Sequence, residues 1–307
     1  MNDDRMQASR GLPIFQVDAF TDIPFGGNPA GVVPDADGLT EKQMQAIARE
    51  MNLSETAFVL KPSDPSADFR VRFFTPAKEV DLCGHATVGT FFFLSEEGVI
   101  SLTGDITQVI LETLAGLLPV EIHRKEGRVA RIMMHQRTPK ILGTLEETEE
   151  LCDILKLSKG HVWMEPQVVS TGLPDLMLPV KTLEALWDMK PDMNRLARFS
   201  DQHGFLSVHA FTMETKSQEA TAHCRDFAPS VGINEEAATG TASGALAAYL
   251  VLNGIITEPN PRMLFEQGYV MDRPSRIFVE VQGTPSGIDM VKVGGSAVTV
   301  MRGSIYL

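Results

Sequence analysis

Residues 81–89, Asp81-Leu82-Cys83-Gly84-His85-Ala86-Thr87-Val88-Gly89, place a polar cluster around a glycine directly before the apolar run 90–94. A second version, Thr239-Gly240-Thr241-Ala242-Ser243-Gly244, precedes the apolar run 245–250. Each pattern predicts a helix with a polar start and a buried body. The first N–H groups of a helix lack partners and carry the positive end of its dipole. Each start is therefore a predicted site for a carboxylate or enolate oxygen, and two facing starts would form one anion-holding cleft.

The two stretches belong to a longer internal repeat. Residues 53–76 align without a gap on residues 206–229, with identical pairs such as Phe58/Phe211 and Arg72/Arg225. A three-residue insertion then pairs Gly84 with Gly240. Because the order of predicted strands and helices agrees on both sides, we interpret the match as an internal duplication.

The duplication predicts two lobes, residues 1–137 and 138–307, with the last strands able to cross back onto the first lobe. The acidic run 146–150 interrupts the alternating pattern near the boundary. Alternating segments on either side predict antiparallel strands, and a helix that is apolar all round must be covered on every side. We expect an α+β fold of two pseudo-symmetric lobes, each a curved, mostly antiparallel sheet wrapped around a central apolar helix.

The composition of the chain indicates which partners and cellular locations to expect. The chain of 307 residues is 43% apolar and 22% charged, with a formal charge of −13 and no basic run, which argues against nucleic acid or an acidic membrane surface as a partner. No apolar stretch reaches the roughly 18 residues that span a bilayer, and the N-terminus lacks a secretory pattern, so we expect a cytoplasmic protein. The cysteines form no Cys-x-x-Cys pair and the histidines no His-x-x-x-His pair, so we expect no metal.

Candidate chemical groups lie where the two repeats differ, because an asymmetric substrate needs asymmetric groups. In the gapless alignment Glu55, at the start of a predicted strand, stands opposite Val208. Cys83 and His85 flank the first glycine, and Glu236 lies in the insertion. Structural alternatives exist for each: a solvated strand-edge glutamate, a small buried cysteine, a capping or core histidine, and an acid that favours the helix dipole.

The sequence also resembles a known family. The matching segments are Phe15–Thr21, Gly27–Val32, Asn52–Phe58, Arg72–Pro76, Leu82–Thr87, Ala238–Ala242, Glu266–Gly268, Arg273–Ser275 and Gly294–Val298. Over nearly its whole length the chain resembles the PhzF-like proteins of phenazine biosynthesis, which have the diaminopimelate-epimerase fold.

The resemblance implies a cofactor-independent isomerase in which a glutamate matching Glu55 moves a proton between carbons of a small carboxylate substrate. His85 and Glu236 match further catalytic positions, and a homodimer is implied. The family's best-known member has aspartate where Glu236 stands and serine where Thr241 stands. The positions expected to bind substrate are Asn28, Ser54, Cys83, Gly84, Thr239, Gly240 and Thr241.

Two alternatives remain at this stage. One is a two-base racemase or epimerase in which Cys83 is the first thiol, although Thr239 stands where the second thiol is needed and its hydroxyl is too weak an acid to replace one. The other is a small-carboxylate-binding protein that has lost its chemistry, since fold alone does not prove activity.

Overall fold

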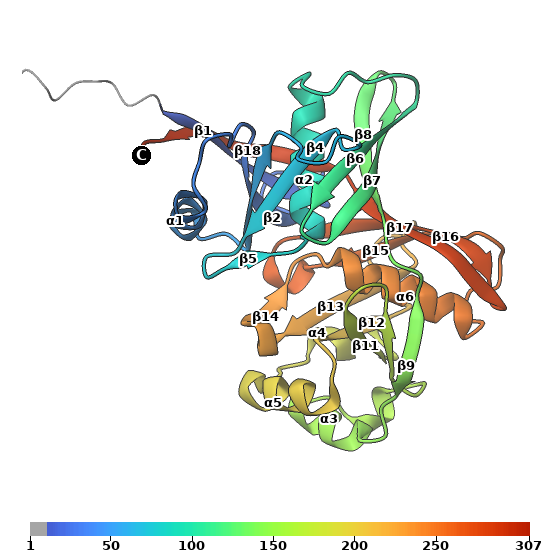
Figure 1. The fold of residues 1–307 in the computed structure, drawn as a ribbon. Coiled ribbons are helices and arrows are strands. Elements are labelled where there is room, and N and C mark those ends of the chain that lie inside the picture. The colour runs from blue at the N-terminus through green and yellow to red at the C-terminus, as the bar shows by residue number, and fades with distance from the viewer. Residues whose placement is uncertain (1–10) are drawn as a thin grey trace, which may run out of the picture. The chain divides into compact units, whose positions relative to one another are not determined.

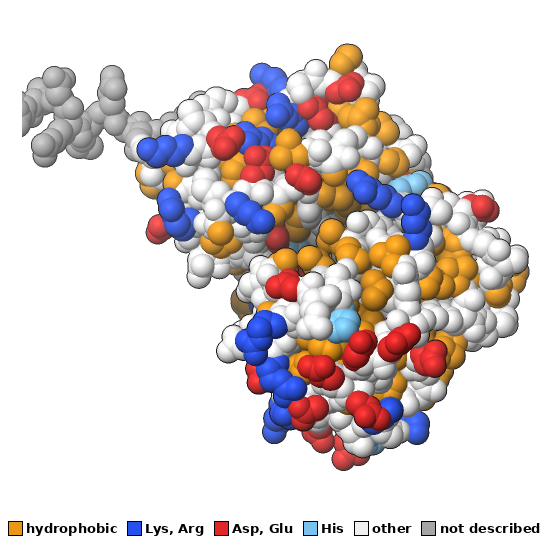
Figure 2. All heavy atoms as spheres, turned by 60° about the horizontal axis from the view of Figure 1, so that its bottom comes forward, with side chains coloured by type: hydrophobic (Ala, Val, Ile, Leu, Met, Phe, Trp, Pro, Cys, Tyr) orange, Lys and Arg blue, Asp and Glu red, His pale blue; other side chains and the backbone are white. Residues whose placement is uncertain are grey.

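The computed structural model describes residues 11–307 and divides into two compact units. Residues 11–25, 29–132 and 296–307 form the first unit, and residues 26–28 and 133–295 form the second. No helix within residues 11–307 is long and apolar enough to cross a membrane. On the face shown in Figure 2, acidic and basic side chains are mixed in the upper part, and several acidic side chains gather in the lower part.

The first unit is built from eleven elements, most of which are labelled in Figure 1. They are β1 (Leu12–Ala19), β2 (Asn28–Val33), α1 (Glu41–Met51), β3 (Glu55–Leu60), β4 (Phe69–Phe74), β5 (Glu79–Val80), α2 (Gly84–Glu96), β6 (Ile106–Thr113), β7 (Gly116–Lys125), β8 (Arg128–His135, whose end lies in the second unit) and β18 (Ala297–Ile305). β1 pairs antiparallel with β18, β2 parallel with β3, β3 antiparallel with β4, β4 antiparallel with β5 and parallel with β6, and β6 antiparallel with β7.

Helix α2 is the centre of this unit. Every residue from His85 to Ser95 is buried, and the helix packs against β1, β3, β7 and β18. Phe93 lies against Phe15 with ring centroids 4.2 Å apart, and Phe91 meets Phe69 edge-on at 5.7 Å. A helix without a polar face is stable in water only inside such an enclosure.

Helix α1 covers the opposite side of the same strands. A capping box between Thr40 and Gln43 starts it, and its apolar stripe packs with Val33, Phe58 and Phe74. Because alternate strand residues point to opposite faces, Phe58 points toward α1, whereas Glu55 and Ala57 point toward α2. The strands therefore form a layer between an amphipathic helix and an apolar one.

The second unit contains the remaining elements. They are β9 (Lys140–Thr144), α3 (Thr148–Leu155), a 3₁₀ turn (Lys159–His161), β10 (Gln167–Ser170), β11 (Pro174–Pro179), α4 (Leu183–Trp187), α5 (Met193–His203), β12 (Ser207–Thr212), β13 (Ala222–Ala228), a 3₁₀ turn (Pro229–Val231), β14 (Ile233–Glu236), α6 (Gly240–Leu252), β15 (Arg262–Gln267), a 3₁₀ turn (Tyr269–Met271), β16 (Ser275–Thr284) and β17 (Gly287–Gly295). Helix α6 is buried almost throughout and packs against β10, β11, β12, β16 and β17.

Strand pairing shows the internal duplication directly. β11 pairs parallel with β12, β12 antiparallel with β13, β13 antiparallel with β14 and parallel with β15, and β15 antiparallel with β16. This is the order found for β2 to β7, with α6 in the place of α2. The α+β architecture with mostly antiparallel strands agrees with the sequence-based prediction.

The gapless alignment is wrong by one residue at the position that matters most. Thr56 pairs with Phe74, whereas Val208 pairs with Phe227. Since Phe74 and Phe227 are equivalent, the structural counterpart of Val208 is Thr56, and that of Glu55 is Ser207. The connection from β12 to β13 is one residue longer than that from β3 to β4, and a slip of one residue moves a side chain to the other face of a strand.

The enclosure of α2 gives a stability prediction. Phe91→Ala is expected to lower the free energy of unfolding by about 3–5 kcal/mol, because a fully buried ring is lost from a packed core. Phe25→Ala, at a ring that is 72% exposed in the same unit, is expected to change it by less than about 0.5 kcal/mol. Urea denaturation measures both, and equal losses would show that α2 is not the core of the first unit.

Candidate active site

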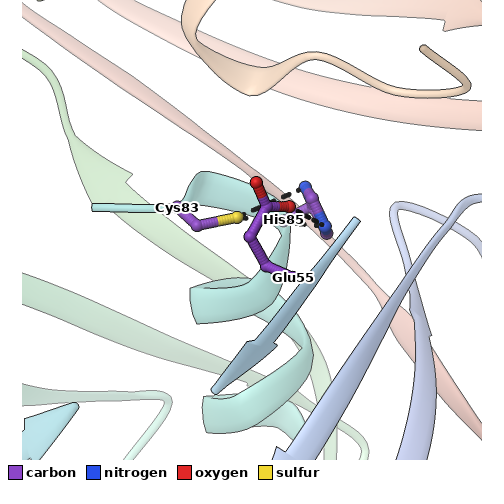
Figure 3. A group of neighbouring side chains, drawn as sticks. All are labelled: Glu55, Cys83 and His85. Carbon is purple, nitrogen blue, oxygen red and sulfur yellow. Dashed lines mark hydrogen bonds and ion pairs between the residues drawn. The ribbon is translucent and has the colours of Figure 1, made fainter. Parts of the chain in front are cut away.

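Three predicted site residues meet at the start of α2 (Figure 3). Glu55 is the first residue of β3, Cys83 is the N-cap of α2, and His85 is the second residue of that helix. His85 Nε2 lies 3.2 Å from Glu55 Oε2, and Cys83 Sγ lies 3.5 Å from His85 Nδ1. The structure thus brings Glu55 together with Cys83 and His85, which follow it by 28 and 30 positions in the sequence.

The electrostatics of this group favour a neutral histidine. Burial lowers the pKa of His85, although the charge of Glu55 partly opposes the shift. The lowered pKa favours the neutral imidazole of His85 at neutral pH. Within the described chain, Glu55 Oε2 is buried and has no aligned hydrogen-bond donor, even though the imidazole nitrogen is close. A largely dehydrated carboxylate oxygen without a donor is well placed to accept a proton.

The start of α2 adds backbone N–H groups that lie before the helix's own hydrogen bonds. Cys83 has extended backbone angles and makes no side-chain cap hydrogen bond. The first bond of the helix runs from Thr87 N to Cys83 O, at 3.0 Å, so the N–H groups of residues 84–86 precede the hydrogen-bonded turns. A Cβ on Gly84 would meet no atom within 4 Å, so there is open space at this helix start. Ser54, the residue before Glu55, is half-buried. This is the local geometry expected of an anion site.

The same three side chains could also hold a cation. One ligand atom from each of Glu55, Cys83 and His85 lies within 4.8 Å of the others, and a thiolate, an imidazole and a carboxylate are zinc ligands. However, the three side chains already contact one another, since His85 lies beside both Glu55 and Cys83. The expectation of a metal-free protein stays a prediction.

A second group of predicted site residues lies in the second unit. Asn28 Nδ2 donates to Glu236 Oε1 at 3.1 Å and to Ala238 O at 3.0 Å. Thr239, the N-cap of α6, donates from Oγ1 to Glu236 Oε2 at 3.2 Å. Gly240 and Thr241 are the first residues of α6. This helix start, like the first, has an extended N-cap without a side-chain cap bond.

The loop that carries Glu236 is held by residues that were not singled out from the sequence. Gln267 Nε2 donates to Glu236 O at 2.8 Å and to Thr239 Oγ1 at 3.0 Å, and Gln267 Oε1 accepts from Thr239 N at 3.2 Å. Gly268 follows with a φ of +80°. The segment Glu266–Gly268 was part of the family resemblance, but nothing in its composition indicates which loop it supports.

Comparison with known proteins settles the family. Residues 17–303 match the family model described as phenazine biosynthesis-like protein, PhzC-PhzF. The chain belongs to this PhzF family. A trans-2,3-dihydro-3-hydroxyanthranilate isomerase of Pseudomonas fluorescens is 35% identical over 296 residues, which cover 95% of this chain and 98% of the relative. An uncharacterised isomerase of Clostridium acetobutylicum is 36% identical, over 97% and 99% of the two chains.

Solved structures agree with this assignment. A PhzF-family protein of Bacillus anthracis has a TM-score of 0.89 and 34% identity, covering 97% of this chain and 100% of that one. A hydroxyproline epimerase of Agrobacterium vitis has a TM-score of 0.64 at 14% identity, which shows a shared fold alone. The predicted fold class is confirmed, and the named relatives make this PhzF-family chain an isomerase.

The Glu236 loop gives a testable prediction. A Cβ on Gly268 would lie 2.3 Å from Arg273 O and 2.6 Å from Ala237 O, so Gly268→Ala must displace the backbone next to Glu236. We expect at least a tenfold loss of isomerase activity and a loss of more than about 2 kcal/mol in the free energy of unfolding.

Gly38→Ala is the matched control. Gly38 has a similar φ of +88°, but its Cβ would meet nothing within 4 Å. This variant carries only the backbone cost of about 1 kcal/mol and should keep full activity. If both variants behave alike in enzyme assay and urea denaturation, crowding at Gly268 does not position the Glu236 loop.

Proposed function

We propose that this isomerase moves a proton between two carbon atoms of a small carboxylate-bearing substrate, with Glu55 as the acid–base group and without a cofactor. The observation that carries the proposal is the buried Glu55 Oε2, without an aligned donor and 3.2 Å from the imidazole of a neutral His85. The named activity of the Pseudomonas fluorescens relative, on a ring carboxylate, supports this substrate class.

The proposed cycle moves one proton within the substrate and leaves the enzyme unchanged. The Glu55 carboxylate accepts a proton from one substrate carbon and becomes a neutral carboxylic acid, while the electron pair of the broken C–H bond delocalises over the substrate. The same carboxylic acid then donates the proton to a second carbon and is a carboxylate again. His85, whose Nε2 lies 3.2 Å from Glu55 Oε2, can donate or relay a proton.

Charge that develops on the substrate needs preorganised donors. The first N–H groups of α2 precede the helix's own hydrogen bonds and belong to a helix whose residues 85–95 are buried, so they can stabilise an anion without reorganising. In the proposal the start of α6, at Thr239 to Thr241, serves the same purpose, and Glu236 is the second catalytic carboxyl group. Because Glu236 and Thr241 are each larger than the residues of the best-known family member, the substrate of this chain can differ from that member's.

Glu55→Gln tests the role of the base. Glutamine keeps the shape and hydrogen bonding of the side chain but cannot accept a proton. We expect turnover, and solvent-deuterium exchange into trans-2,3-dihydro-3-hydroxyanthranilate or other small carboxylates, to fall by about 10²-fold to 10⁴-fold. Affinity for carboxylates, measured by calorimetry, should stay near normal because helix N–H groups hold the anion.

Glu121→Gln is the matched control. Glu121 has the same side-chain exposure of 12% as Glu55, and its Oε2 lies 3.0 Å from His123 Nε2, so it is a comparable Glu–His pair outside the proposed site. Glu121→Gln should leave turnover unchanged. Retained exchange in Glu55→Gln, together with its loss in His85→Asn or Glu236→Gln, would assign the base to another residue. Bound carboxylates that never exchange would favour a binding protein.

Cys83→Ser separates this mechanism from thiol-based racemisation. The sulfur lies 3.5 Å from His85 Nδ1, as a thiol–imidazole pair would, but Thr239 occupies the equivalent position at the second helix start. We expect Cys83→Ser to keep most of the activity. A loss of several orders of magnitude, with rapid alkylation of Cys83 at neutral pH, would support thiol chemistry instead.

A further inference from the structure

The side chains of Glu55, Cys83 and His85 bring three kinds of metal-binding atom together in the first unit (Figure 3). His85 Nε2 lies 3.2 Å from Glu55 Oε2 and 3.9 Å from Cys83 Sγ, and one ligand atom of each residue lies within 4.8 Å of the others. Within residues 11–307, no other group of three histidine, cysteine or acidic side chains is so compact. Three protein ligands are the number that many catalytic zinc sites have.

The separations of these atoms are close to those in a zinc site. Zinc binds sulfur at about 2.3 Å and nitrogen or oxygen at about 2.0–2.2 Å, so tetrahedral ligand atoms lie about 3.4–3.6 Å apart. The histidine–glutamate distance is slightly shorter than this, and the histidine–cysteine distance is slightly longer. The remaining distance, from sulfur to carboxylate oxygen, has to shorten by at most about 1.2 Å. Rotation of side chains can supply a change of this size without movement of the backbone.

The charges of the group also suit a dication. A thiolate and a carboxylate carry two negative charges, which balance Zn²⁺, and buried charges are stable when they are balanced by ligands. Cys83 and His85 are only 7% and 5% exposed. The positive end of the α2 dipole by itself disfavours a cation, but it stabilises negative charge on Cys83, the N-cap residue of that helix.

The donor atoms determine which ion fits. Thiolate sulfur and imidazole nitrogen favour zinc, whereas Mg²⁺ and Ca²⁺ take oxygen ligands. Three protein ligands leave a fourth position of a tetrahedral ion for water or another small ligand. There is open space for it beside Gly84, because a Cβ on that residue would meet no atom within 4 Å.

We propose that Glu55, Cys83 and His85 bind Zn²⁺, and that the bound ion inhibits this isomerase. A coordinated carboxylate oxygen cannot accept the proton of the substrate, and a coordinated imidazole nitrogen cannot relay one. The inhibition rests on the proposed role of Glu55, whereas the binding of zinc does not. Zinc acts here as a reversible inhibitor and not as a cofactor, so the proposal agrees with a reaction that needs no metal.

Cobalt substitution tests the site without any substrate. Co²⁺ is a coloured ion that accepts the same ligands as Zn²⁺. Tetrahedral coordination gives it intense visible absorption bands, and a cobalt–thiolate bond adds a charge-transfer band in the near ultraviolet. We expect both features when the reduced protein is titrated with Co²⁺, and we expect Zn²⁺ to abolish them. Mg²⁺ at the same concentration should leave the spectrum unchanged.

Two cysteine variants locate the site. Cys83→Ser should remove the charge-transfer band and weaken zinc binding at least about tenfold, because even residues behind a metal ligand change affinity by about 10–100-fold. Cys152→Ser is the matched control. Cys152 is also buried, at 3% exposure, but it lies in the apolar cluster of the second unit. This variant should keep the cobalt spectrum and the zinc affinity of the unmodified protein.

Activity supplies a second readout. Micromolar free Zn²⁺, set by a metal buffer, should inhibit the isomerase, and a chelator should restore its activity. Inhibition is expressed as the ratio of the activities of one variant with and without zinc, so a change in basal activity does not affect the comparison. Cys83→Ser should need at least about tenfold more zinc than the unmodified protein for the same fractional inhibition. Cys152→Ser should need the same amount.

Two results would overturn the site: a cobalt complex without the thiolate band, or equal zinc affinity in Cys83→Ser and the unmodified protein. If Cys83→Ser does not fold, the spectra of the unmodified protein and of Cys152→Ser still decide whether a thiolate other than Cys152 binds the ion. Zinc that binds here without inhibiting would overturn the inhibitory role. Failure of the Glu55 mechanism in the deuterium-exchange test would leave the cobalt spectra unchanged, so the two proposals are tested separately.

Discussion

Each unit must enclose a helix that has no polar face. Residues 85–95 of α2 are buried in succession, and α6 is buried almost throughout, so strands have to surround each helix. Only the ends of such a buried helix can contact solvent or a ligand. At the N-terminal end the first N–H groups have no acceptor within the helix, and the helix dipole is positive. The side chains predicted to act lie at these ends: Glu55 and His85 at α2, and Glu236 and Thr239 at α6. Enclosing each helix therefore also fixes the position of the proposed anion site at its N-terminal end.

The sequence was sufficient for the parts of the fold that depend on composition and period. The apolar runs after Gly84 and Gly240 predicted the two central helices, and the repeat predicted a duplicated order of strands, which the pairings of β2–β7 and β11–β16 show. The sequence was insufficient where a shift of one residue in the alignment changes which side chains are equivalent. The alignment placed Glu55 opposite Val208, because a single extra residue between β12 and β13 leaves no compositional trace. For the same reason Ser207, His209 and Asp226 looked like ordinary strand residues, although together they form a buried polar chain.

The two candidate carboxyl groups differ because their surroundings differ. Glu55 Oε2 lies beside a neutral imidazole and has no aligned donor within the described residues, which favours a group that exchanges protons. Glu236 accepts one hydrogen bond from the Asn28 amide and one from the Thr239 hydroxyl, so both of its carboxylate oxygens are held in place. Assigning different tasks to the same functional group through its environment is a general device of acid–base enzymes. In this chain the duplication supplied two similar helix starts, and divergence in the strands around them supplied the difference.

The pairing of β1 with β18 ties the first unit to a segment that is distant in sequence. During synthesis on a ribosome, β1 emerges long before residues 297–305, and the whole second unit is made in between. Until then the edge of β1 that β18 will cover presents unpaired N–H and C=O groups, which can recruit other strands. The second unit, whose residues other than 26–28 are continuous in sequence, can complete its core first. The sheet of the first unit therefore stays incomplete until almost the whole chain has been made.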